Sequence, residues 1–166
     1  MPRPPSKTAE ELMAELSSDP AHQQTVVEQR ARNYALLKEI EFQELVICSE
    51  LRKLGYGIES VWDLVNNTPH PVLERRFLGP YPLAYPALVR NLALPHHPKV
   101  REGIIRALTV RDGGEPVWRA LLAQFAVEER PDLRWVLSNA LKVTMPYKER
   151  RKHPEIANVY KHRGAL

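Results

Sequence analysis

The most regular feature of the hydrophobic pattern is a segment that occurs twice. Residues 85–108 and 118–141 align at a constant offset of 33 without a gap. In each copy, apolar or small residues follow the 3/4 spacing of one buried helix face. These residues are Val100, Gly103, Ile104, Ala107 and Leu108 in the first copy, and Leu133, Val136, Leu137, Ala140 and Leu141 in the second. A repeat of this kind predicts two units that stack and bury each other's apolar faces.

Each copy is predicted to be a pair of helices joined by a short turn. Pro98 and Pro131 are typical of a first helical position, where the missing N–H costs no hydrogen bond. Asp112, Gly113 and Gly114 form the linker between the copies. The expected first helices are about 83–94 and 116–127, and the expected second helices are 98–110 and 131–143.

Before the repeats, the pattern predicts a long helix over residues 20–54. Asp19 and Pro20 suit the N-cap and the first helical position, and Gly55 suits a C-terminal cap. We expect its second half to pack on the body and its polar first half, 22–33, to project or to pair with a second copy. The second half carries an apolar stripe of Leu37, Ile40, Ile47, Leu51 and Leu54.

Shorter helical segments are predicted elsewhere in the chain. They are a helix from Thr8 to about Leu16, one over 58–66 that carries Trp62, one or two turns within 72–78, and a last helix from Pro154 to about His162. Trp62 and Trp118 fall on apolar helix faces, which favours packing in the core.

A helix pair that opens with Pro-x-Val/Leu-Arg and carries Ala-Leu near its end resembles the HEAT-repeat superfamily, in particular its short bacterial members. The residues that carry this resemblance are Pro98, Val100, Arg101, Ala107 and Leu108, with Pro131, Leu133, Arg134, Ala140 and Leu141. The resemblance covers residues 85–143 and implies a short right-handed α-solenoid of HEAT-like helical hairpins. Ankyrin and tetratricopeptide repeats fit less well, but they too predict stacked helix pairs.

We therefore expect an all-α chain that forms a single helical domain. It would follow a disordered tail, 1–6, and extend over 7–166, with HEAT-like repeats at about 82–110 and 115–143. No apolar run approaches the roughly 20 residues that span a bilayer, and the N-terminus does not resemble a signal peptide. The cytoplasm is the expected compartment, and no membrane partner is expected.

The basic charge is confined to the end of the chain. Residues 1–141 hold 17 Lys and Arg against 18 Asp and Glu, whereas residues 142–166 hold 7 against 2. A basic segment of this kind can bind nucleic acid, bind an acidic protein or remain a solvated tail. Its candidate nucleic-acid contacts are Lys148, Arg150, Arg151 and Lys152.

Positions that differ between the copies and face away from the core are available for binding. These pairs are Lys99/Asp132, Glu102/Trp135, Ile105/Ser138, Arg106/Asn139 and Thr109/Lys142. Second helices usually line the binding face of a helical solenoid, so we predict partner contacts there. Trp135 is either an interface anchor or a residue packed beneath the C-terminal segment, covered by Met145 or Tyr147. The predicted partner-binding residues are Glu102, Arg106, Trp135, Asn139 and Lys142.

Other conspicuous residues have structural interpretations. Arg101 and Arg134 occupy the same place in both copies, which favours a structural role such as pairing between repeats. Cys48 lies among apolar residues and is expected to be a buried, inert thiol. His96 and His97 precede a helix start, where turn and capping roles are favoured over a metal site.

The chain shows no phosphate loop, catalytic triad or metal-ligand spacing, and we expect neither a cofactor nor catalysis. The favoured function is a protein-interaction or adapter module, and an inhibitor or immunity protein would be one form of it. The alternative is a nucleic-acid-binding protein similar to the HEAT-like DNA glycosylases, with Trp135 and Asp132 in the roles of concave residues.

Overall fold

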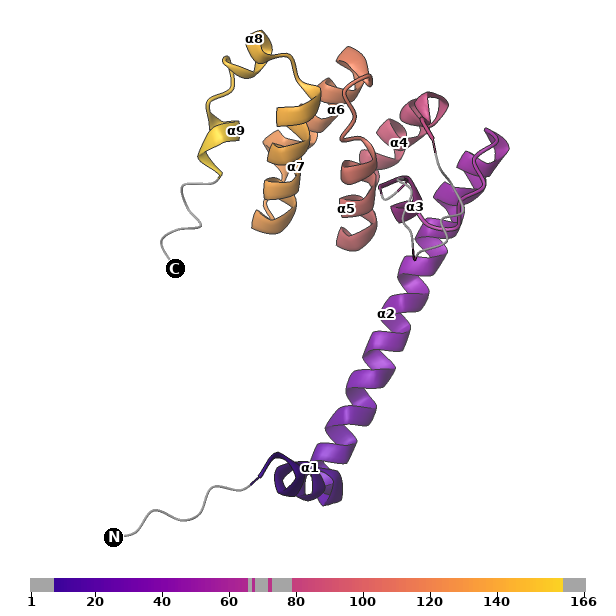
Figure 1. Ribbon diagram of the computed structural model, residues 1–166, viewed down its shortest axis with the longest axis vertical. Helices are drawn as coiled ribbons and strands as arrows, with labels where there is room; N and C mark the ends of the chain where they lie inside the picture. The colour runs from indigo at the N-terminus through magenta and orange to yellow at the C-terminus, as the bar shows by residue number, and fades with distance from the viewer. Residues whose placement is uncertain (1–7, 66, 68–71, 73–78, 160–166) are drawn as a thin grey trace. The chain divides into compact units, whose positions relative to one another are not determined.

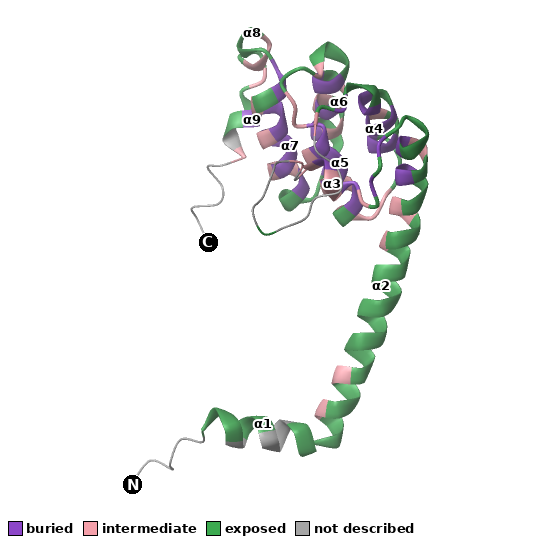
Figure 2. Ribbon diagram, turned by 45° about the vertical axis from the view of Figure 1, so that its right-hand side comes forward, coloured by how far each residue is buried: buried purple, intermediate pink, exposed green. Residues whose placement is uncertain are grey.

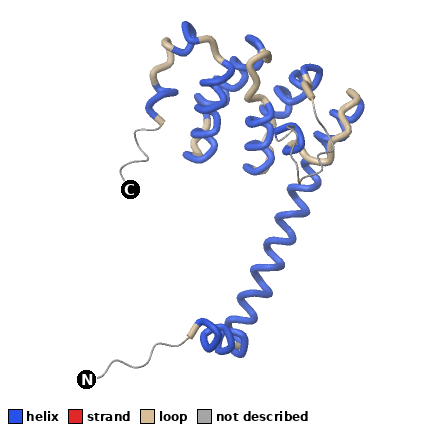
Figure 3. Tube along the Cα trace, viewed as in Figure 1, coloured by secondary structure: helices blue, strands red, loops and turns tan. Residues whose placement is uncertain are grey.

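The computed structural model describes residues 8–65, 67, 72 and 79–159, and its regular elements in these ranges are all helical (Figure 1, Figure 3). The all-α prediction is therefore confirmed. The tail 1–6 and most of 72–78 lie outside the described residues. The elements are α1 (Ala9–Ser18), α2 (Pro20–Lys53), α3 (Trp62–Val65), the 3-10 helix η1 (Pro82–Ala84), α4 (Tyr85–Leu92), α5 (Pro98–Ala107), α6 (Gly114–Val127), α7 (Pro131–Thr144), α8 (Tyr147–Arg150) and α9 (Glu155–Asn158).

The chain divides into two compact units, residues 1–39 and 40–166. The first unit holds α1 and the beginning of α2. The Asp19 carboxylate accepts a hydrogen bond of 2.9 Å from the Ala21 N–H, which confirms the predicted N-cap. None of the side chains described between residues 8 and 39 is buried (Figure 2).

The second unit contains the buried core. It includes the end of α2, where Ile47, Cys48 and Leu51 are fully buried and Ile40 is half-buried. The predicted stripe was wrong at its two ends, because Leu37 and Leu54 are exposed. Leu54 lies past the last residue of the helix, and Leu37 lies in the first unit, where no described side chain is buried.

Gly55 ends α2 as predicted. Its φ of 95° is in the left-handed region, which a residue without Cβ adopts at little cost. The Gly55 N–H donates to the Arg52 carbonyl, and the Tyr56 N–H donates to the Leu51 carbonyl. This pair of hydrogen bonds is the Schellman motif, and it satisfies carbonyl groups that the helix end would otherwise leave without a partner.

The two repeats form contacting helix pairs. In the first, α4 packs on α5, and in the second, α6 packs on α7. The pairs meet through α4 against α6 and through α5 against α7, as Figure 1 shows. Every residue of the predicted apolar faces in 100–108 and 133–141 is buried. The 33-residue offset therefore predicted the buried residues of both repeats correctly.

Further segments flank the repeats in the second unit. On one side, α3 packs on α5, with Trp62 above Gly103. A Cβ built on Gly103 would lie 3.1 Å from Trp62 Nε1, so a larger residue there would require the Trp62 ring to shift by a few tenths of an ångström. Trp62 is half-buried, whereas Trp118 is buried as predicted. On the other side, α9 packs on α7.

Candidate interaction surface on the second helices

The five predicted partner-binding residues lie on two neighbouring helices. Glu102 and Arg106 belong to α5, and Trp135, Asn139 and Lys142 belong to α7. These helices are in contact, and all five residues are partly exposed. We call these five residues the second-helix surface. The structure brings them onto adjacent elements, and their role in binding stays a prediction.

The α5 part of this surface is preorganised by charge and by an aromatic ring. Arg106 forms an ion pair of 2.8 Å with Glu102, one helical turn earlier. Its guanidinium carbon lies 6.0 Å from the centre of the Trp62 ring, within the range of a cation–π contact. Arg106 is therefore held between a carboxylate and an aromatic ring before any partner arrives.

The α7 part of this surface is continuous with the core. Trp135 is partly buried and packs against the core cluster, so it is neither fully covered nor fully exposed. Met145 is buried and Tyr147 is exposed. The Lys142 carbonyl accepts a hydrogen bond of 2.5 Å from Arg150 Nη1, which ties α7 to the C-terminal segment.

One predicted pair does not belong to this surface. Ile105 and Ser138 are fully buried, although their divergence suggested outward-facing positions. Ser138 Oγ donates to the Ile156 carbonyl over 2.8 Å, beneath α9. Both positions lie on helices that are covered by a further layer, since α7 packs on α5 and α9 packs on α7.

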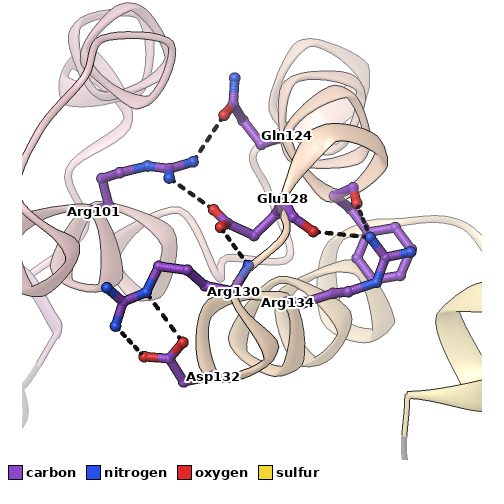
Figure 4. A network of polar contacts seen from close by, with 7 residues as sticks. Arg101, Gln124, Glu128, Arg130, Asp132 and Arg134 are labelled. Atoms are coloured by element: carbon purple, nitrogen blue, oxygen red, sulfur yellow. Dashed lines mark hydrogen bonds and ion pairs between the residues drawn. The ribbon is translucent and has the colours of Figure 1, made fainter.

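Arg101 joins the two repeats, as predicted (Figure 4). Its Nη1 lies 2.7 Å from Glu128 Oε2 in an ion pair, and its Nη2 donates to Gln124 Oε1 over 3.0 Å. Glu128 Oε2 is shielded from solvent and its contact with Arg101 lacks the alignment of a hydrogen bond. Glu128 Oε1 accepts from the Arg130 N–H over 3.1 Å.

Arg134 has a structural role of a different kind from that of Arg101. Its Nη1 donates to the carbonyl oxygens of Phe125 and Glu128, at 2.8 and 3.1 Å. Its guanidinium carbon lies 4.2 Å from the centre of the Phe125 ring. These contacts lie within the second repeat and satisfy carbonyls at the end of α6. Pairing between repeats is therefore wrong for Arg134.

The predicted nucleic-acid residues are in and after α8. Lys152 forms an ion pair of 2.8 Å with Glu149, which lowers the pKa of that carboxyl group. Arg150 donates to the Lys142 carbonyl and stacks near Tyr147, whereas Lys148 and Arg151 are exposed. Three of the four residues, Lys148, Arg151 and Lys152, are therefore exposed, and Arg150 is partly buried.

The predicted structural roles of Cys48 and His97 are confirmed. Cys48 is buried, and burial, with the nearby Glu44 carboxylate, raises the pKa of its thiol to about 12. His97 Nδ1 accepts from the Lys99 N–H over 3.2 Å and so caps α5. Burial, and next to it the charge of Arg101, lowers the pKa of His96. Within the described ranges, no three His, Cys, Asp or Glu residues gather to hold a metal ion.

Two surface hollows on the second unit had no signal in the sequence. One, of about 540 Å³, is lined by Arg119, Leu122, Ala123, Phe125, Ala126, Arg134, His153 and Glu155. The other, of about 520 Å³, is lined by Arg111, Gly114, Glu115, Trp118, Arg119, Thr144, Pro146, Glu149 and Lys152. Both combine residues of α6 with residues more than 20 positions further along the chain, and no local pattern reports that proximity.

Across the part of the chain that is described, no helix combines the length and the apolar character that crossing a bilayer requires. Comparison of the chain with models of known families, with curated proteins and with solved structures gave no match.

Proposed function

We propose that this chain is a non-catalytic interaction module, a short HEAT-like solenoid that binds another protein through the second-helix surface. The observation that carries the proposal is the Glu102–Arg106–Trp62 arrangement on α5 and α3, together with the partly exposed Trp135 on α7, the helix that packs against α5. Trp and Arg are the residues most enriched at binding hot spots. A module of this kind acts in the cytoplasm as an adapter, and an inhibitor or immunity protein would use the same surface.

Preorganisation is the physical reason why this surface suits binding. A long side chain that is already ordered loses less conformational entropy when a partner covers it. Arg106 is ordered by Glu102 and Trp62, and Trp135 is anchored in the core by part of its ring. The buried seam of each repeat keeps α5 and α7 in a fixed relation, so the two halves of the surface are presented together.

The test compares Trp135→Ala with Tyr147→Ala in the full chain. Tyr147 is an exposed aromatic residue outside the second-helix surface. We expect Trp135→Ala to weaken binding of a captured partner by about 2 kcal/mol, roughly 30-fold, and Tyr147→Ala to leave the affinity unchanged. Affinity is measured by calorimetry, and urea unfolding of each variant is measured in parallel.

The parallel unfolding measurement decides between two roles of Trp135. A loss of about 3–5 kcal/mol in unfolding free energy, with no selective loss of binding, would make Trp135 a core residue and would contradict the proposal. A gel-shift titration separates the nucleic-acid alternative. Retention of duplex or single-stranded DNA that disappears in Lys148→Ala/Arg151→Ala and falls steeply with salt would support that alternative instead.

A further inference from the structure

The hollow of about 540 Å³ on the second unit is a surface pocket that no described side chain fills. Its apolar lining, which we call the floor, consists of Leu122, Ala123, Phe125 and Ala126 of α6. The other lining residues are Arg119, Arg134, His153 and Glu155. Ala123 and Ala126 are exposed, so apolar floor remains in contact with solvent. An amphipathic helix that placed two or three apolar side chains there would remove that surface from water.

The charges around the hollow favour an acidic occupant. The lining residues include two guanidinium groups and one carboxylate. Glu155 already contacts His153 Nδ1 at 3.0 Å. Arg134 uses Nη1 for two uncharged carbonyl groups, and it forms no ion pair with any residue that the structure describes. Arg119 contacts Glu115 at 2.5 Å, but this pair is largely exposed and is therefore weak and exchangeable.

Among the helices that the structure describes, α1 has the complementary properties. Residues 8–19 hold four carboxylates and no Lys, Arg or His. Leu12 and Met13 of α1 are 46% and 65% exposed, although both are apolar. A helix of 10 residues is marginal in water without tertiary packing, and no side chain described in residues 8–39 is buried. A partner surface that covered its apolar side chains would therefore stabilise this helix.

We propose that α1 of one copy of this chain docks in the α6 hollow of a second copy. Leu12 and Met13 would cover the apolar floor, and the Glu10 carboxylate would face the guanidinium groups of Arg119 and Arg134. A reciprocal exchange of the two α1 helices closes a two-fold dimer, in which each contact occurs twice. The α6 hollow shares no residue with the second-helix surface, so this proposal and the proposed function can be tested independently.

The first test measures the oligomeric state of the full chain by light scattering and sedimentation. We expect a dimer whose dissociation constant rises with salt, since exposed charges are screened at high ionic strength. Met13→Asp and Arg119→Glu should each weaken the dimer by roughly tenfold or more. Met13→Asp would bring a negative charge onto the apolar floor, and Arg119→Glu would place a carboxylate opposite the carboxylate of Glu10. Glu10→Arg combined with Arg119→Glu should restore part of the affinity.

A control variant distinguishes this dimer from one formed through α2. Tyr34 is an exposed residue of α2, and Tyr34→Asp should leave the dimer intact. Dissociation by Tyr34→Asp, with no effect of Met13→Asp, would overturn the proposal and assign the interface to α2. A strict monomer at roughly 100 μM and low salt would also overturn it.

The second test locates the contact by disulfide cross-linking between separate molecules. Protein with Met13→Cys is mixed with protein carrying Ala126→Cys, and the mixed dimer is read on a non-reducing gel. Cys48 is buried and its thiol pKa is about 12, so the native thiol should give little background. Leu83→Cys, at an exposed site outside the hollow, replaces Ala126→Cys as the control. Equal cross-linking of the two partners would overturn the proposal.

Discussion

Residues that recur at equivalent places do not need to make equivalent contacts. Arg101 and Arg134 share a position in the two repeats, yet Arg101 reaches Glu128 of the next repeat and Arg134 holds carbonyls of its own repeat. The reason is that Arg101 lies at the junction of the two pairs, whereas Arg134 belongs to the second pair. Glu128 supplies the carboxylate at this junction, and its counterpart in the first copy is Pro95.

The Arg101–Glu128 pair gives a prediction about stability. The two side chains are 19% and 4% exposed, so removing Glu128 leaves a guanidinium group with little water and no counter-charge. We expect Glu128→Ala to lower the unfolding free energy by about 3–5 kcal/mol, measured by urea denaturation. Glu129→Ala, at the adjacent exposed position, should change it by less than about 0.5 kcal/mol. Equal losses of unfolding free energy in both variants would show that the buried ion pair does not stabilise the protein more than an exposed residue does.

In α2, the helix ends were predicted more accurately than the buried face. Local chemistry sets an end: Asp19 caps the start of α2, and Gly55 closes it with a left-handed residue. The exposed face of a helix depends instead on what packs against it. This is why Leu37 and Leu54 were assigned to the buried stripe, whereas the structure buries only Ile47 and Leu51 of its five members and leaves Ile40 half-buried.

The end of α2 gives a second prediction. Gly55→Ala places a Cβ at φ 95°, which should cost about 1–2 kcal/mol in unfolding free energy. Gly57 is the matched control, because a Cβ built there meets nothing within 4 Å and its φ lies outside the left-handed region. We expect Gly57→Ala to change stability by less than Gly55→Ala, in thermal and urea unfolding alike. The reverse order would exclude the Schellman motif as the reason for Gly55.

For the molecule as a whole, burial is very unequal between the two units. The described side chains of 8–39 include none that is buried, whereas the core cluster extends from Ile47 to Ile156 in the second unit. Helical hydrogen bonds without tertiary packing open with a small free energy.

Hydrogen exchange should show this difference directly. We expect amides in 20–39 to exchange at least roughly 100-fold faster than those in α5, which corresponds to about 3 kcal/mol in opening free energy. In a dimer of the proposed kind, α1 should gain protection as the protein concentration rises. Equal protection in both units would mean that the first unit has tertiary packing absent from this structure.

The pH dependence of stability should reflect His96. Burial, and secondarily Arg101, lowers the pKa of His96 below its ordinary value near 6.5 in the folded protein. The unfolded chain then binds more protons below pH 6.5, so this contribution to stability is complete above pH 6.5 and is lost as the pH falls toward the folded pKa. His96→Asn should flatten that part of the curve in urea titrations between pH 7.5 and roughly 5. An unchanged slope would remove His96 as the cause.

The Arg130–Asp132 pair acts in a separate, more acidic window. A hydrogen bond from Arg130 lowers the pKa of Asp132 below its ordinary 3.8. Its contribution is therefore present above pH 3.8 and is lost only at lower pH, outside the range that tests His96. The pair is exposed, so a small effect is expected there.

The amino-acid sequence was sufficient for the helical class, the repeat, its bounds within a few residues and the complete apolar seam. Those features follow from periodicity and from caps, which act between residues close in the chain. It also placed the five residues of the second-helix surface on two helices that do contact each other. It misjudged Ile105 and Ser138, and it gave no indication of Glu128 as the partner of Arg101 or of the α6 hollow. These features depend on which helix packs over which other helix. Such contacts join residues that are far apart in the chain, and no periodic pattern in the sequence indicates which of them meet.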